Sequence, residues 1–144
     1  MKRVAKVLIV DDEPDVLLLL RIELEAEGYE TLLAADGETA LRRIFEERPD
    51  IVLLDVMMPV VDGWGVLQRL ADKGVDTPVI VLSAKASEGD IAHALELGAQ
   101  EYVTKPFEPA ALLATVAHVL TSAPQELEAG RRRRLQQLSS FHSR

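Results

Sequence analysis

Short apolar stretches alternate with helix-forming stretches five times along the first 120 residues, and this alternation limits the possible folds most strongly. The apolar stretches are continuous rather than alternating with polar residues, which is typical of strands buried on both faces. Strands separated by helices favour a parallel sheet with helices on both sides. The sequence therefore predicts an α/β fold with a single five-stranded parallel sheet and five helices on its two faces. The predicted strands are residues 5–10, 29–35, 50–55, 77–84 and 99–104.

Proline and glycine mark several helix ends. Pro14 suits the first turn of the first helix, with an acidic residue before it as the cap. Gly28 and Gly74 suit helix C-caps, and Pro49 ends the second helix. In the first helix we expect Leu20 and Leu24, with Val16, to form the buried stripe.

Composition excludes several classes of function. The chain has 144 residues and a formal charge of −8, which argues against a nucleic-acid-binding body. It has no cysteine, so disulfides, thiolate metal sites and thiol nucleophiles are excluded. Its apolar runs are too short for a signal peptide or a membrane span. We expect no membrane partner and a cytoplasmic location.

Polar residues stand where the predicted strands end. Asp11 and Asp12 follow the first strand, Asp55 ends the third, Ser83 ends the fourth and Lys105 follows the fifth. The carboxyl ends of parallel strands lie at one edge of a sheet, where such folds bind their ligands. We therefore expect three carboxylates, a hydroxyl and an ammonium to meet there.

This set of groups suits a magnesium ion and a phosphoryl group. Each pair of carboxylates at about 4 Å repels by roughly 4 kcal/mol at an effective dielectric constant near 20. Mg²⁺ prefers oxygen ligands and relieves this repulsion. Lys105 and Ser83 suit phosphate oxygens, and Asp55 is placed as a nucleophile toward phosphorus.

Taken singly, each residue has a simpler interpretation. Asp12 could be a helix N-cap, and Asp55 could cap the turn that follows it. Ser83 could be an ordinary loop serine, and Lys105 a solvated surface lysine. The prediction depends on their falling together at one edge of the sheet.

The sequence resembles the receiver domain of two-component response regulators over about residues 5–120. Receiver domains have a doubly wound, flavodoxin-like (βα)5 fold. The resemblance implies that residues 1–121 form such a domain. The motifs that carry the resemblance are "VLIVDDEP", "DIVLLDVMMPVVDG", "VIVLSA" and "LGAQEYVTKPF".

The resemblance implies a phosphoacceptor and a metal site. Asp55 would take a phosphoryl group from a histidine kinase or a histidine phosphotransfer protein. Asp11 and Asp12 would be the acidic pair for Mg²⁺, with Asp12 and Asp55 as direct ligands and the main-chain carbonyl of Met57 as a third. The segment "MMPVVDG" matches the loop after the acceptor strand.

The resemblance also implies a switch. Lys105 would hold the acyl phosphate, and the Lys105–Pro106 peptide bond would be cis. On activation Ser83 would turn toward the phosphate and Tyr102 would swing inward behind it. The partner surface of the fourth helix, fifth strand and fifth helix would then change, so the domain would be a signalling switch and not a metabolic enzyme.

The sequence departs from this family in two places. Receivers that drive winged-helix transcription factors often read Asp-Asp-Tyr where this chain reads "QEY", and often carry arginines in helix five, where "LLATVAHVLTS" has none. Dimerisation of that kind is not predicted, although a dimer stays possible. Leu18 and Ile22 form an outward pair on the first helix, either scattered apolar residues or a kinase docking spot.

Residues 122–144 form an arginine-rich tail without a receiver pattern. Residues 121–144 hold five arginines and two glutamates, a net charge of +3, which leaves −11 for the first 120 residues. The tail could begin an output domain, form a coiled linker or dimerisation helix, or touch RNA, DNA or lipid. We expect Pro124 and Gly130 to interrupt any helix running onward from the body. A helix over 131–141 would align Leu135, Leu138 and Phe141 on one side.

Two other functions compete with the signalling switch. A phosphatase with an aspartyl-phosphate intermediate uses a D-x-D motif, whereas this chain has Met57 at the second position, and methionine cannot move protons. A flavin- or nucleotide-binding module would need a glycine- or hydroxyl-rich loop after the first strand, where "DDEPD" would repel phosphate. The cognate kinase and the output are not predicted from this sequence.

Overall fold

The computed structural model describes residues 4–57, 62–85 and 87–142, and it shows strands and helices alternating as predicted. No helix within these residues combines the length and the apolar character that a membrane span needs. The elements in chain order are β1 (Lys6–Val10), α1 (Pro14–Ala26), β2 (Glu30–Ala34), α2 (Gly37–Glu47), β3 (Ile51–Asp55), α3 (Gly63–Asp72), β4 (Val79–Ser83), α4 (Glu88–Glu96), β5 (Glu101–Thr104), α5 (Pro109–Thr121) and α6 (Pro124–His142).

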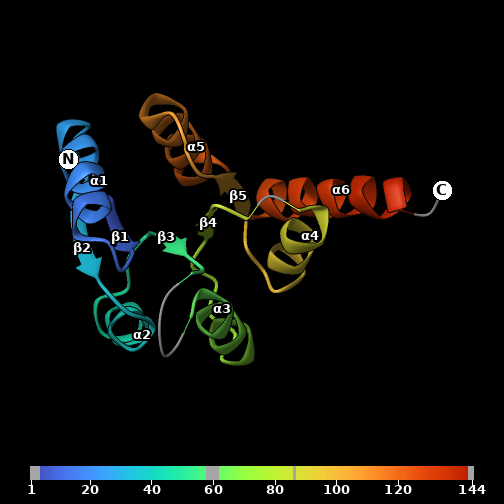
Figure 1. The fold of residues 1–144 in the computed structure, drawn as a ribbon, viewed down its shortest axis with the longest axis horizontal. Coiled ribbons are helices and arrows are strands. Elements are labelled where there is room, and N and C mark those ends of the chain that lie inside the picture. The colour runs from blue at the N-terminus through green and yellow to red at the C-terminus, as the bar shows by residue number, and fades with distance from the viewer. Residues whose placement is uncertain (1–3, 58–61, 86, 143–144) are drawn as a thin grey trace.

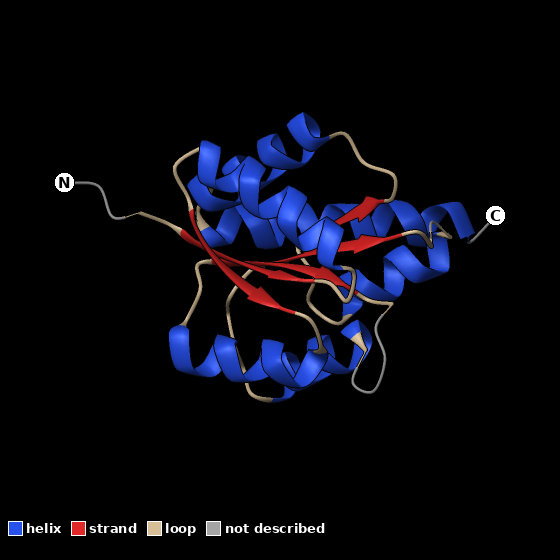
Figure 2. Cartoon of the chain, turned by 60° about the vertical axis from the view of Figure 1, so that its left-hand side comes forward, coloured by secondary structure: helices blue, strands red, loops and turns tan. Residues whose placement is uncertain are grey.

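The five strands form one parallel sheet in the order β2-β1-β3-β4-β5. Figure 2 shows the strands lying between helices on the two faces of the sheet. Strand β2 lies on one side of β1, and β3, β4 and β5 follow in turn on the other side, so the strand order reverses between β1 and β3. In open α/β sheets, ligands bind outside the carboxyl ends of the strands at such a reversal. The predicted fold class is confirmed.

Two apolar cores explain why the strands are apolar throughout. On β1, Val7 and Ile9 pack with helices α1 and α5 on one face of the sheet. Leu8 and Val10 pack with α2, α3 and α4 on the other face. Because both faces are covered, all residues of β3 and β4 and those of β1 after Lys6 are buried, and the polar residues of these strands stand at their ends.

The predicted helix ends are largely confirmed. Gly28 and Gly74 have φ angles of +92° and +65°, a conformation that glycine adopts without strain. Pro14 is the first residue of α1, as predicted. Glu13 precedes it at the N-cap, but its side chain makes no capping hydrogen bond. An acidic residue therefore stands at the expected N-cap position, but its side chain does not cap the helix.

The tail agrees with its prediction at Pro124 and differs from it at Gly130. Residues Pro124–His142 form a sixth helix, α6, which runs through Gly130 without interruption. Figure 1 shows α6 lying beside α4 and β5, and Leu127 packs against the core between the sheet and α5. Helix α5 ends at Thr121 and α6 begins at Pro124, so the interruption expected at Pro124 is confirmed, and proline is tolerated in the first turn of the new helix. That residues 1–121 fold without the tail stays a prediction.

Gly63 allows the chain to close tightly after β3. Its backbone N–H donates to the carbonyl oxygen of Val56, at 3.2 Å. A Cβ atom at this position would lie 2.7 Å from the carbonyl oxygen of Asp55 and closer still to Cα of Val56. Both neighbours are backbone, which cannot rotate away as a flexible side chain could.

We predict that Gly63→Ala destabilises the protein by about 1–3 kcal/mol, because the added methyl group overpacks the end of β3. Gly89→Ala is the control: its Cβ would meet nothing closer than 3.9 Å, and alanine favours helix α4. Urea unfolding measures both variants. Equal midpoints for Gly63→Ala and the wild type would contradict the close approach.

Candidate functional site

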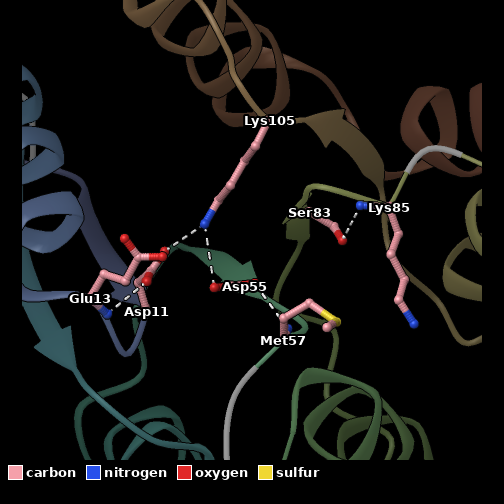
Figure 3. A network of polar contacts seen from close by, with 7 residues as sticks. All are labelled: Asp11, Glu13, Asp55, Met57, Ser83, Lys85 and Lys105. Atoms are coloured by element: carbon pink, nitrogen blue, oxygen red, sulfur yellow. Dashed lines mark hydrogen bonds and ion pairs between the residues drawn. The ribbon is translucent and has the colours of Figure 1, made fainter.

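The structure brings the predicted site residues to one edge of the sheet. Asp11 follows β1, Asp55 ends β3, Ser83 ends β4 and Lys105 follows β5. Figure 3 shows the side chains of Asp11, Asp55 and Lys105 pointing toward one another from three different segments. The parallel topology is the cause, since each of these strands ends at this edge.

Asp11, Asp12 and Asp55 form an acidic cluster. One carboxylate oxygen from each lies within 4.8 Å of the other two. Asp11 and Asp55 are buried, whereas Asp12 is exposed. Buried carboxylates of like charge need a cation, and three hard oxygen donors suit Mg²⁺. The residues present therefore fit the predicted Mg²⁺ ion.

Lys105 supplies part of the compensating charge. Its Nζ lies 3.0 Å from Oδ2 of Asp11 and 3.3 Å from Oδ2 of Asp55. Its side chain is only 20% exposed, so it is not the solvated surface lysine of the simpler interpretation. Burial lowers the pKa of Lys105, but hydrogen bonds and attraction to Asp11 and Asp55 outweigh burial, and the net pKa is raised.

Asp55 is held by a backbone group as well as by Lys105. Its Oδ1 accepts a hydrogen bond from the backbone N–H of Met57, at 2.9 Å, so Asp55 also caps the following turn. Burial raises the pKa of Asp55 above its usual value, although the Met57 N–H and Lys105 oppose this rise. The metal-binding role of the Met57 carbonyl stays a prediction. Residues 58–61 of the "MMPVVDG" loop lie outside the described residues.

Asp12 is not the N-cap of α1. That position is occupied by Glu13, whose backbone N–H donates to Oδ1 of Asp11 at 2.9 Å. The exposed Asp12 carboxylate therefore has no capping role and stands beside two buried carboxylates. This arrangement favours the metal-site interpretation over the simpler one.

Ser83, Lys85 and Tyr102 form a second group beside the carboxylates. Oγ of the buried Ser83 accepts from the backbone N–H of Lys85, at 3.1 Å. The Tyr102 hydroxyl donates to the carbonyl oxygen of Lys85, at 2.7 Å. Tyr102 is only 6% exposed, so it already occupies the inward position that we expected after activation. No sequence pattern pointed to Lys85, because only its backbone takes part.

The cis Lys105–Pro106 bond and the outward apolar pair are both observed. The peptide bond is cis, as the resemblance implied.

Leu18 and Ile22 are more than half exposed, and Leu19 adds a third exposed apolar side chain that we did not predict. These residues lie on α1, which begins beside the acidic cluster.

Residues 7–117 match the family described as the response regulator receiver domain. The chain belongs to this family. It is 44% identical over 115 residues to the alkaline phosphatase synthesis transcriptional regulatory protein PhoP of Bacillus subtilis (strain 168), covering 80% of this chain and 48% of that protein. It is 47% identical over 115 residues to the probable transcriptional regulator ycf27 of Guillardia theta, covering 80% and 45%. The chain spans about half the length of these curated relatives.

Solved receiver structures have the same fold. The receiver domain of the Francisella response regulator 1452 superposes with a TM-score of 0.78 at 34% identity, covering 81% of this chain and 96% of that chain. The chemotaxis protein CheY4 of Vibrio cholerae gives 0.77 at 33% identity, covering 81% and 99%. This receiver domain is thus a signalling domain of two-component systems.

We predict that the Lys105 ion pairs stabilise the receiver domain below pH 10.5 and that this stabilisation is lost at higher pH. The folded pKa of Lys105 lies above 10.5, so the unfolded chain releases its proton first as the pH rises. Lys105→Met should lower the free energy of unfolding by roughly 1–3 kcal/mol at about pH 9, with a smaller deficit at about pH 11.5.

Urea unfolding at both pH values measures the two differences. Tyr102 also has a raised pKa, caused by its burial, and it contributes an alkaline loss to both proteins, so it cancels in the comparison. Lys73→Met, at the exposed end of α3, is the control. A deficit that does not change with pH would show that Lys105 acts by packing alone.

Proposed function

We propose that Asp55 accepts a phosphoryl group from the phosphohistidine of a histidine kinase or a histidine phosphotransfer protein. One observation carries the proposal: the buried Asp55 carboxylate stands 3.3 Å from an ammonium group and within 4.8 Å of two further carboxylates. The ammonium neutralises the incoming phosphoryl oxygens, and the carboxylates bind the cation that the transfer requires.

The transfer itself uses few groups of this chain. A carboxylate oxygen of Asp55 forms a bond to phosphorus while the bond between phosphorus and the histidine nitrogen breaks, and the electron pair of that bond stays on the imidazole. Lys105 holds the transferred group by contact with its oxygens. The Met57 N–H keeps Oδ1 of Asp55 in place, at 2.9 Å.

Asp11, Asp12 and Asp55 would hold Mg²⁺, with Asp12 and Asp55 as direct ligands and the Met57 main-chain carbonyl as a third. When bound, the ion supplies positive charge to the phosphoryl oxygens in the transition state. The orientation of Asp55 would then depend on both the ion and Lys105.

Ser83 and Tyr102 form the proposed switch. In this structure Oγ of Ser83 accepts from the Lys85 N–H, and a phosphoryl group on Asp55 offers the Ser83 hydroxyl an acceptor with more negative charge. When Ser83 turns toward that group, the Lys85 N–H loses its acceptor. Tyr102 donates to the carbonyl of the same residue, so the change reaches β5 and the face formed by α4, β5 and α5.

The chain is proposed to act as a switch whose only chemistry is its own phosphorylation and dephosphorylation. A phosphatase is not favoured, because the second residue after Asp55 is Met57, which offers no acid for turnover. We also propose that the exposed residues Leu18, Leu19 and Ile22 on α1 contact the helices of the phosphodonor, since α1 begins at the site. A phosphodonor of this kind implies the cytoplasm as the location.

We predict that Mg²⁺ raises the melting temperature of this chain. At about ten times its dissociation constant, the ion adds roughly 1.4 kcal/mol, which is about 3–6 °C for a domain of this size. Asp12→Ala should abolish the increase, whereas Asp15→Ala, at an exposed carboxylate in the first turn of α1, should keep it. Thermal unfolding with and without Mg²⁺ measures the effect. An unchanged curve for the wild type would count against the metal site.

We predict that Asp55→Asn removes all phosphoryl labelling by acetyl phosphate in Mg²⁺, because an amide is not a nucleophile toward phosphorus. Asp15→Asn should label like the wild type. Lys105→Ala should keep the Mg²⁺-induced stabilisation but weaken the response to phosphorylation. Intact-protein mass spectrometry detects the single labile group. Labelling of Asp55→Asn at a residue outside the acidic cluster would rule out Asp55 as the acceptor, and repeated turnover of acetyl phosphate would favour the phosphatase.

A further inference from the structure

Helix α6 lies beside helix α4 and the edge strand β5 of the sheet. The sheet ends at β5, and α6 contacts β5 and the neighbouring helix α4 (Figure 1). An edge strand presents unpaired backbone groups and is a common place for a partner to bind. In this structure a segment of the same chain lies there instead.

Among the described residues, Leu127, Arg131 and Arg134 hold α6 on this surface. The carbonyl oxygen of Leu127 accepts from Nε2 of Gln100, at 2.8 Å, and the Leu127 side chain packs against the core. Nη1 of Arg131 donates to the carbonyl oxygen of Leu95 at the end of α4, at 3.4 Å. Nη1 of Arg134 lies 3.0 Å from Oε2 of Glu101 on β5.

The residues of α6 that make these contacts form one stripe. Leu127, Arg131 and Arg134 are spaced i, i+4 and i+7, which places them on the same face of a helix. Arg132 points elsewhere: it is 73% exposed and pairs only with Glu128, one turn back on α6, among the described residues. The arginine run is therefore divided between a docked face and a solvent face.

The docking is incomplete, which favours exchange with another helix. A cavity of about 770 Å³ opens beside Leu127 and Arg131, between α6 and the loop before β4. The Arg134–Glu101 pair is about one-third exposed on both sides, and such pairs stabilise weakly. The covalent connection to α5 keeps α6 close to this surface even when these contacts break.

We propose that α4 and β5 form a helix-binding surface, that α6 occupies it in the free protein, and that partner helices of the same chemistry displace α6. The matching pattern is a leucine followed by arginines four and seven positions later. On α6, Leu127 occupies the leucine position. On the surface, the Leu95 carbonyl and the Glu101 carboxylate bind the two arginines. The proposal goes beyond phosphotransfer and does not rest on it.

Charge reversal in the full-length chain tests whether α6 depends on this surface. Arg134→Glu should speed hydrogen exchange of the α6 amides about five-fold or more, because it replaces an attraction to Glu101 by a repulsion. The double variant Glu101→Arg with Arg134→Glu should restore slow exchange. Arg132→Glu, which makes the same change on the solvent face, is the matched control. Equal exchange in Arg134→Glu and Arg132→Glu would overturn the proposal.

A labelled peptide of residues 123–142 tests the surface from outside. Because an occupied surface cannot accept a second helix, the peptide should bind the Arg134→Glu chain at least about five-fold more tightly than the wild-type chain. It should bind the double variant weakly, since the positive charge that Glu101→Arg introduces would repel the arginines of the peptide. Fluorescence anisotropy measures the three affinities. Equal binding to the wild-type and Arg134→Glu chains, or no binding to either, would overturn the helix-binding surface.

Discussion

A parallel sheet that is covered on both faces leaves only its edges for polar chemistry, and the site of this receiver domain depends on that constraint. The two cores on either side of β1 and β3 exclude charge from the strand interiors. Because the strands run in the same direction, Asp11, Asp55 and Lys105 all reach the same edge from separate parts of the chain. The polar site and the apolar core are therefore two results of one topology.

The charges at that edge balance only in part. Lys105 contacts two buried carboxylates, and burial still raises the pKa of Asp55. The proposed Mg²⁺ ion would reduce the repulsion between these carboxylates, and a phosphoryl group on Asp55 would pair with the ammonium of Lys105. The charge imbalance that lowers the stability of the site would therefore favour binding of the proposed ligands, and displaced pKa values often mark functional sites.

Two residues of β5 that precede Lys105 make contacts with other parts of the chain. Tyr102 of β5 contacts the Lys85 carbonyl near the acidic cluster, while its neighbour Glu101 contacts Arg134 of α6. One short edge strand therefore has the proposed switch on one side and the docked tail on the other. A second helix in the position of α6 would contact Glu101, the residue that precedes Tyr102. Partner binding and the proposed switch would therefore share strand β5.

The sequence by itself determined the sheet, its two covered faces, the edge at which the site residues gather and the exposed Leu18 and Ile22, because local periodicity and strand-end residues carry that information. It did not determine α6. In the sequence Gly130 indicates an interruption that the structure does not have, and the stripe expected from Leu135, Leu138 and Phe141 did not name Leu127, Arg131 or Arg134, which dock the helix among the described residues. Helix propensity is weak enough for packing to override it. Arg131 and Arg134 find partners on α4 and β5 that lie more than thirty residues away in the chain, and only the tertiary structure decided which side of α6 would face them.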